Sequence, residues 1–507
     1  MHRHRVVTPA LKSILVSSSS ARRGSSMLSY VDPATPSSAT IPSSGGVRRR
    51  PWEGAVLKSC AARKQIRVSL DAVLEVSTGK RPWRSSFGEA NPEVQPGAEP
   101  EFARPACNNY VQDRESRKLA EGQLQSAQYL HRELPVRLAS AVTELDKMTD
   151  TGLTDALPTA RVRENYLQSF RELQETQRPH DRDSVESFTA TVDRVHQRDS
   201  DTVLLMACGL RDLMRGRGGS GGGRVRKGAD EGEELERVQD FLDHFYQNRV
   251  AMRFLCGHYL ALSSPPRKGF VGLVQRGVSL TNIAQAAAME AASICCSALG
   301  ACPEVRMSVD RSGDGLVAAV PEYVHYVVLE VLKNAMRATM QAHGKGESES
   351  ERREGVSTGG GGGDGVTRRP IVFADVPEVS ISVRKRGADD LLLVVGDHGG
   401  GIPAEATDKV WSYLYTTAGD AVRNAYLANG GNSPGKPAPL AGLGYGLPLS
   451  RLYARNFGGE LMLHPAVDRQ GTDAVLCLSR HGTRLEPLVW PSEGEANDGE
   501  IDSNVHL

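Results

Sequence analysis

A helix with two chemically different faces is predicted between Val324 and Met340. At about 100° per residue, its small apolar side chains fall on one stripe that can face a core. A polar stripe lies beside it, and the spacing sets Glu330 and Asn334 one turn apart, both directed past the core toward a cleft. The apolar stripe consists of Val324, Val327, Val328, Val331, Ala335 and Ala338; the polar stripe consists of Glu330, Asn334 and Arg337, with Lys333 at its edge.

The polar stripe has a chemical use as well as a structural one. The amide oxygen of Asn334 is a hard ligand that suits magnesium, which proteins often hold with one or two oxygens. The carboxylate of Glu330, one turn away, can orient or deprotonate a hydroxyl group. The same pair is also typical of the solvated edge of an amphipathic helix, so the rest of the chain has to distinguish the two interpretations.

A second motif runs from Val394 to Pro403, where an apolar strand leads directly into Asp397. Three glycines, Gly399–Gly401, then allow the backbone to turn and approach a ligand closely. A carboxylate at a strand end can accept a hydrogen bond from an exocyclic amine such as that of adenine. A simple tight turn after a strand would give the same pattern.

A third motif, Gly442–Ala454, sets glycines at alternate positions before a helix with Pro448 in its first turn. Glycine amides and the positive end of a helix together form an anion site that suits a triphosphate. The spacing is Gly-x-Gly-x-Gly with no strand leading into it, which excludes a Rossmann dinucleotide site. Gly458 and Gly459 supply the helix stop, and Thr472 opens the last predicted strand within Gly471–Ala474.

In this order, the four motifs resemble the GHKL ATPase superfamily, which has the Bergerat fold. More narrowly, four segments are similar to the mitochondrial pyruvate and branched-chain 2-oxoacid dehydrogenase kinases, and the resemblance extends from about Gln123 to Leu478. The segments are Glu133–Ala139, Leu332–Met340, Trp411–Ala418 and Gly442–Ala454. The hallmark motifs of eukaryotic protein kinases, Val-Ala-Ile-Lys, His-Arg-Asp and Asp-Phe-Gly, do not occur.

The resemblance implies a role for each matched residue. Glu330 matches the general base that acts on a substrate serine, and Asn334 matches the magnesium ligand. Lys333 and Arg337 match basic residues that support the phosphates or the base, and Asp397 matches the acid that binds adenine. The resemblance implies ATP and magnesium as cofactors, and it also allows potassium. Further nucleotide contacts are expected at Gly399, Gly401, Thr416, Thr417, Gly442, Gly444, Gly446, Leu447 and Thr472.

The activity that the resemblance implies is phosphorylation, and so inhibition, of the dehydrogenase component of a 2-oxoacid dehydrogenase complex. The lipoyl-bearing core of that complex is the expected docking partner, and a homodimer is expected. The C-terminal tail departs from the pyruvate kinases, because Trp490 follows Val489 rather than an aspartate. Two alternatives stay open: a histidine-type kinase that uses His258 or a histidine of a partner protein, and a non-catalytic ATP-binding regulator. The motifs do not separate a pyruvate from a branched-chain substrate.

Composition adds the compartment and excludes some partners. The first fifty residues are rich in Arg and Ser and hold a single acid, Asp32, which is typical of a mitochondrial or plastid transit peptide. Together with the family resemblance, this predicts the mitochondrial matrix. A disordered basic tail would look similar. The net charge of +0 favours no nucleic-acid partner, and no apolar run reaches the ~20 residues of a membrane span. The eight cysteines lack disulfide or zinc spacing and indicate reduced thiols.

The fold class predicted is α+β with two domains: a four-helix bundle, then an α/β sandwich with one mixed sheet and helices on one face. Helical patterns run through Tyr166–Thr176, Ser184–Met214 and Glu234–Ala261, and Pro135 is expected near a helix start or at a kink. Strands are expected at Val379–Val383 and Leu391–Val395, with a hairpin at Glu460–Leu478. The predicted divisions are an unfolded leader at 1–110, the bundle at 111–270 with an insert at 215–235, the nucleotide domain at 271–485 with an insert at 344–370 and a lid at 416–441, and a mobile tail at 486–507.

Overall fold

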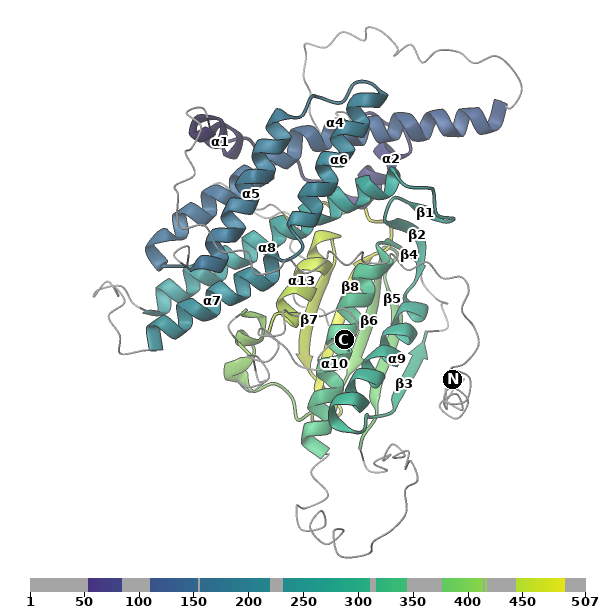
Figure 1. The fold of residues 1–507 in the computed structure, drawn as a ribbon. Helices are drawn as coiled ribbons and strands as arrows, with labels where there is room; N and C mark the ends of the chain where they lie inside the picture. Colours follow the sequence, from purple (N-terminus) through teal and green to yellow (C-terminus); the bar gives the residue numbers. More distant parts are fainter. Residues whose placement is uncertain are drawn as a thin grey trace, which may run out of the picture.

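The computed structural model describes residues 53–83, 110–153, 156–218, 231–310, 316–343, 376–413, 415–416 and 444–487. A group of long helices forms one part of the molecule, and a helix-covered sheet forms the other (Figure 1). Within the described residues, no helix is both long and apolar enough to span a membrane.

The helical part follows from the apolar periodicity of the N-terminal half. Side chains of α4, α5 and α8 share one core that includes Leu134, Phe170 and Phe245. Helix α6 begins with a reciprocal cap, in which Asp181 accepts from the backbone of Ser184 at 2.9 Å. The helices are α4 (Tyr110–Lys147), α5 (Leu157–Glu175), α6 (Arg182–Arg198), α7 (Thr202–Gly218) and α8 (Glu231–Leu262), with a 3₁₀ turn, η2, at Met148–Thr151.

Three sequence predictions for this part need correction. The segment Ser184–Met214 is two helices, because the chain turns at Asp199, whose carboxylate is drawn inward by Arg249 and Arg253. Pro135 lies inside α4, more than six turns of helix after Tyr110, which excludes the expected helix start and leaves the kink as a prediction. The insert predicted at 215–235 is shorter at both ends, since α7 reaches residue 218 and α8 starts at residue 231.

The predicted unfolded leader at 1–110 is also wrong for residues 53–83. They form α1 (Glu53–Ala61) and α2 (Leu70–Ser77), which pack against α4. Leu74 and Trp83 are buried in the helical core, so the segment is part of the fold. Residues 1–52, which hold the predicted transit peptide, lie outside the described residues.

The predicted mobile tail at 486–507 is wrong for Glu486. Glu486 is 2% exposed and accepts from the Val68 amide at 3.2 Å. Its neighbour Leu485 pairs with Ser69 in an antiparallel bridge. The chain is therefore held against the N-terminal segment as far as Glu486, and residues 488–507 lie outside the described part.

The main sheet is mixed, as predicted, and has the strand order β3-β5-β6-β8-β7. Strands β3 and β5 are parallel and the other neighbours are antiparallel. The hairpin predicted across Pro465–Gln470 is confirmed, with Leu461 opposite Leu476. The strands are β3 (Val305–Val309), β5 (Val379–Arg386), β6 (Asp390–Gly396), β7 (Glu460–Pro465) and β8 (Thr472–Ser479).

A second, smaller sheet was not predicted. It pairs β1 (Phe270–Val271), β2 (Val274–Ser279) and β4 (Leu316–Ala319) in antiparallel order. The strands are too short to show a clear alternation, and a bulge between Gln275 and Val278 shifts their register. The C-terminal half therefore holds two sheets rather than one.

Helices α9 (Leu280–Leu299), α10 (Pro321–His343) and α13 (Gly446–Asn456) lie together against the main sheet (Figure 1). The apolar stripe of α10, except Ala338, which lines a cavity, enters the same core as Leu391, Leu393 and Val395 of β6. Because successive strand residues alternate in direction, this packing fixes which face of β6 meets the helices. It leaves the polar stripe of α10 facing the end of β6, where Asp397 follows the strand.

Candidate nucleotide site

A cavity of about 600 Å³ lies between α10, the loop after β6 and the start of α13. This volume is in the range of pockets that hold small molecules and cofactors. All of the predicted site residues that the structure describes line it. They are Glu330, Lys333, Asn334, Arg337, Asp397, Gly399, Gly401, Thr416, Gly444, Gly446, Leu447 and Thr472.

On α10, the acid and a base of the polar stripe are paired. Lys333 Nζ donates to Glu330 Oε1 at 2.7 Å, and the lysine side chain is only 9% exposed. Asn334 lines the same wall of the cavity. Arg337 lies one turn further along the wall, and burial lowers the pKa of its guanidinium. The helix thus presents a carboxylate, an amide and two cations to one cavity.

At the opposite wall, Asp397 is fixed through one of its two carboxylate oxygens. Its Oδ1 accepts from the backbone amides of Gly399 at 2.8 Å and Thr472 at 3.1 Å. Burial raises the pKa of the Asp397 carboxyl, and these two hydrogen bonds and Arg469 oppose the increase. Because Oδ1 carries both amide contacts, Oδ2 is the oxygen left to meet a ligand donor in the cavity.

Two glycines make the cavity by leaving out a side chain. A Cβ on Gly446 would lie 2.6 Å from Glu330 Oε2, so the first residue of α13 can approach the acid only as glycine. Gly444 has φ +84°, and a Cβ there would meet the Tyr415 carbonyl oxygen. The amino end of α13 therefore opens directly onto the cavity beside Glu330. Such an end attracts phosphate through its free amides and helix dipole.

Thr417 and Gly442 lie outside the described residues, as do the predicted lid from residue 417 onward and the whole insert at 344–370. Among the lining residues that sequence reasoning missed are Tyr326, Tyr415 and Val203. Tyr326 precedes Glu330 by four residues, and this helical spacing was a usable signal. Val203 comes from α7, and no local pattern connects it with a site more than a hundred residues away.

The cavity is tied to the helical part of the molecule. Gln239 Oε1 of α8 accepts from Ser412 Oγ at 3.0 Å and from the Tyr413 amide at 3.2 Å. Tyr246 of α8 also contacts Tyr413 and Tyr445, with ring centroids 5.0 and 5.8 Å away. Residues on both sides of the predicted lid are thereby anchored to α8.

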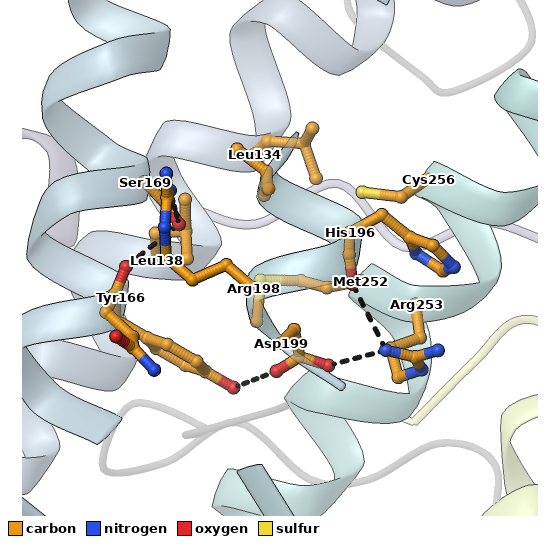
Figure 2. Close-up of a pocket in the computed structure, with 12 residues that line it drawn as sticks. Leu134, Leu138, Tyr166, Ser169, His196, Arg198, Asp199, Met252, Arg253 and Cys256 are labelled. Carbon is orange, nitrogen blue, oxygen red and sulfur yellow. Dashed lines mark hydrogen bonds and ion pairs between the residues drawn. The ribbon is translucent and has the colours of Figure 1, made fainter. Parts of the chain in front are cut away.

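A second cavity lies among α4, α5, α6 and α8, and has a volume of about 20 Å³. Figure 2 shows Tyr166 and Arg253 directed at the carboxylate of Asp199. In the same view, Arg198 is bonded to Ser169, at 2.8 Å. The volume suits about one water molecule. Most polar side chains around it bond to one another, whereas the buried Nδ1 of His196 has no hydrogen-bond partner in the described part of the chain.

His258, the candidate phospho-acceptor of the alternative interpretation, is 3% exposed. Its Nδ1 accepts from the Leu273 amide at 3.4 Å, and its Nε2 lies 2.9 Å from Ser77 Oγ. Burial lowers its pKa to about 3. A neutral, enclosed ring between α2 and α8 is a packed structural histidine, and a phosphoryl donor cannot reach it.

Comparisons with known proteins place the chain in a family. The family model of the mitochondrial branched-chain alpha-ketoacid dehydrogenase kinase matches residues 108–275. A mitochondrial pyruvate dehydrogenase (acetyl-transferring) kinase of Arabidopsis thaliana is 31% identical over 75% of this chain and 91% of its own length. Isozyme 3 of the human enzyme is 30% identical over 70% of this chain and 77% of its own. A solved mycobacterial sensor histidine kinase covers 40% of this chain and 97% of its own at 16% identity, with a TM-score of 0.25.

These matches define a protein kinase of the mitochondrial dehydrogenase-kinase class. The chain belongs to the family of mitochondrial pyruvate and branched-chain α-ketoacid dehydrogenase kinases. Membership implies the use of ATP and Mg²⁺ and a mitochondrial location. The cavity suits both ligands, since a Cβ would fill the space left at Gly444 and Gly446, and Asn334 supplies a hard oxygen.

Proposed function

We propose that this chain is an ATP-dependent protein-serine kinase of the mitochondrial matrix. It phosphorylates, and so inhibits, the dehydrogenase component of a pyruvate or branched-chain 2-oxoacid dehydrogenase complex. The observation that carries the proposal is that one cavity joins Glu330 and Asn334 of α10, Asp397 after β6 and the amino end of α13. A non-catalytic regulator would need no acid beside the phosphate site, yet Glu330 faces it.

At the adenine end, Asp397 accepts a hydrogen bond from the exocyclic amine with Oδ2, while Gly399 and Gly401 leave room for the base. Thr472 closes this end of the cavity, and its amide also holds Asp397 in place. Thr416 and Leu447 line the wall between the adenine end and the phosphate end. We assign Thr417 and Gly442 to the same site by their positions in the motifs.

At the phosphate end, the amides at Gly444 and Gly446 cradle the anionic oxygens. Asn334 would hold Mg²⁺, and the ion would supply positive charge beside the phosphoryl group. Lys333 and Arg337 add positive charge along the same wall. Glu330 orients the substrate hydroxyl and accepts its proton, so that the serine oxygen is positioned for in-line attack. The catalytic contribution is mainly electrostatic, because the cavity holds these charges in place before reaction.

The rest of the chain serves the complex. We propose that residues 111–270 form a four-helix-bundle domain that docks the lipoyl-bearing core, and that residues 271–485 form a GHKL kinase domain. A homodimer and a potassium ion near the nucleotide are further parts of the proposal. The contacts from Gln239 and Tyr246 to residues on both sides of the lid support communication between the two domains.

The proposal is tested by phosphoryl transfer from labelled ATP to purified pyruvate and branched-chain dehydrogenase complexes. Wild type should label serine on one of them, and Glu330→Gln should lose transfer while it keeps ATP binding. A matched control is Glu322→Gln, which removes the same charge from the exposed first turn of α10. The label should survive acid, which destroys phosphohistidine. If wild type binds ATP but labels neither complex, the kinase assignment is wrong.

A further inference from the structure

Arg469 lies in the turn between β7 and β8 and does not line the cavity, yet it contacts Asp397, which does. Its Nε donates to the backbone carbonyl of Asp397 at 2.8 Å. Its Nη1 bonds to Asp468 at 2.8 Å, and its Nη2 pairs with Asp473. The side chain is 16% exposed, so the guanidinium is mostly enclosed by these partners.

The same turn holds the Asp397 loop through its backbone. The Asp397 amide donates to Thr472 O at 3.0 Å, and the Gly400 amide donates to Gln470 O at 3.3 Å. With the Thr472 amide on Oδ1, the amide, the carbonyl and one carboxylate oxygen of Asp397 are all bonded to the hairpin. Arg469 supplies the carbonyl contact, which sets the orientation of the peptide group that follows Asp397.

The residue before Asp397, Gly396, leaves room for this arginine because it has no side chain. A Cβ on Gly396 would collide with the Arg469 guanidinium, and it would lie 2.7 Å from Asp473 Oδ1. The last residue of β6 is therefore a glycine where the guanidinium crosses the strand end. Strand, arginine and Asp473 fit together as one arrangement behind the wall of the cavity.

The charges around Asp397 also indicate a role for Arg469. Asp397 and Asp473 are two acids held close to one cation. Burial raises the pKa of Asp397 and the charge of Asp473 raises it further, whereas Arg469 lowers it. A protonated Asp397 could turn its O–H toward the exocyclic amine, whereas both oxygens of an ionised carboxylate only accept, so the ionised form is the better acceptor.

We propose that Arg469 is a positioning residue for nucleotide recognition, which orients Asp397 so that its Oδ2 selects a purine with an exocyclic amine. This inference rests on the proposed ATP site. It assigns selectivity for the base to a pair of residues, one of them outside the cavity. It also predicts that Arg469 affects binding of the base without affecting transfer of the phosphoryl group.

The test compares ATP with purine riboside triphosphate, which lacks the exocyclic amine, in calorimetric binding and steady-state kinetics. Arg469→Gln should weaken ATP binding about tenfold, as expected for loss of a charge-assisted contact, and should weaken the analogue less than about twofold. KM for ATP should rise with little change in kcat. The increase in KM at low pH should begin at a higher pH than in wild type. The double variant Arg469→Gln with Asp473→Asn should shift that increase back, because it removes the unpaired acid.

Each control separates one explanation. Arg194→Gln removes an exposed, ion-paired arginine from the helical part and should change the binding affinity of neither ligand. If Arg469→Gln does not fold, Arg469→Lys is used instead. It keeps the charge and should still weaken the binding of ATP more than the binding of the analogue. If Arg469→Gln weakens the binding of ATP and of the analogue equally, or weakens the binding of neither, the inference is overturned while the kinase assignment stands. Wild type that binds no ATP overturns both, since Arg469 would then have no adenine site to position.

Discussion

Lys333 Nζ lies 2.7 Å from Glu330 Oε1, so the carboxylate of the proposed catalytic base is held by a cation one turn further along the same helix. Both side chains are largely buried, and the pair faces the amino end of α13. The lysine therefore has two tasks: it orients the carboxylate, and it carries positive charge next to the phosphate cradle.

Lys333→Gln should lower kcat about 10²-fold, because a positioned charge of this kind typically contributes that much. ATP affinity should change less, since Asp397 and the glycine amides remain. The measurement is kcat and ATP affinity determined on the same preparations. A variant with normal kcat would show that the Lys333–Glu330 pair is only structural.

Gly446→Ala should reduce phosphoryl transfer about tenfold or more, because the new Cβ would lie 2.6 Å from Glu330 Oε2 and displace it. Gly54→Ala is the matched control, since no atom lies within 4 Å of a Cβ at that helical position. Thermal unfolding should show Gly54→Ala as neutral or slightly stabilised. Equal activity in the two variants contradicts the close contact between α13 and Glu330.

Asp397→Asn should invert the preference for the base. Its carbonyl oxygen can still accept from the amides of Gly399 and Thr472. The amide nitrogen then faces the base, where it opposes the amine of adenine but suits the carbonyl oxygen at position 6 of guanine. ATP affinity should fall about 10²-fold relative to GTP affinity, as measured by competition against a fluorescent nucleotide. An unchanged ATP to GTP ratio would place the base elsewhere.

His258 should make the fold sensitive to mild acid. Its pKa is lowered from 6.5 to about 3 by burial. A lowered pKa in a base means that the folded state binds fewer protons, so stability is full above pH 6.5 and falls as the pH drops toward 3. Between pH 7 and pH 5 this residue alone should cost about 2 kcal/mol.

The check is urea unfolding of wild type and His258→Gln at both pH values. The difference in unfolding free energy between the two proteins should narrow by about 2 kcal/mol at pH 5, because the glutamine does not titrate. An unchanged difference would mean that His258 is protonated in the folded state. The same variant should keep its kinase activity if serine phosphorylation does not pass through a histidine.

Much of the site could be predicted because its signals are local. The spacing of Glu330 and Asn334 fixes a shared helix face, and Gly399 and Gly446 mark turns that side chains would block. The order of these motifs then matched a family with a known pocket. The structure brings the described members together because the apolar stripe of α10 has to pack on β6, which turns the polar stripe toward the strand end.

What sequence reasoning missed depends on contacts between distant segments. Helix α2 is short, and its apolar side chains gain stability only by packing on α4. Strands β2 and β4 are joined across almost forty residues and show little alternation. Arg469 carries no motif, since its partners Asp397 and Asp473 become neighbours only when β6 and β8 pair. None of these contacts leaves a periodic trace in the sequence.

Arg137 should be the most costly single residue to remove from the helical part. It lies between two buried acids: its Nε donates to Glu133 at 3.0 Å, and its Nη2 donates to Glu486 at 2.5 Å. The Nη2 also donates to Ile66 O at 3.0 Å, so the guanidinium joins α4, the N-terminal segment and the C-terminal end of the described chain. Arg137→Met leaves two carboxylates buried without their cation and should cost about 3 to 5 kcal/mol.

Urea unfolding measures this cost, and Lys147→Met is the matched control, because it removes an exposed cation from the same helix. The control should stay within about 0.5 kcal/mol of wild type. Adding Glu486→Gln to Arg137→Met should recover part of the loss, since it removes one of the two uncompensated charges while an amide oxygen remains for the Val68 amide. If the double variant is no more stable than Arg137→Met, the loss comes from packing rather than charge. The C-terminal contact would then be incidental to the stability of the helices.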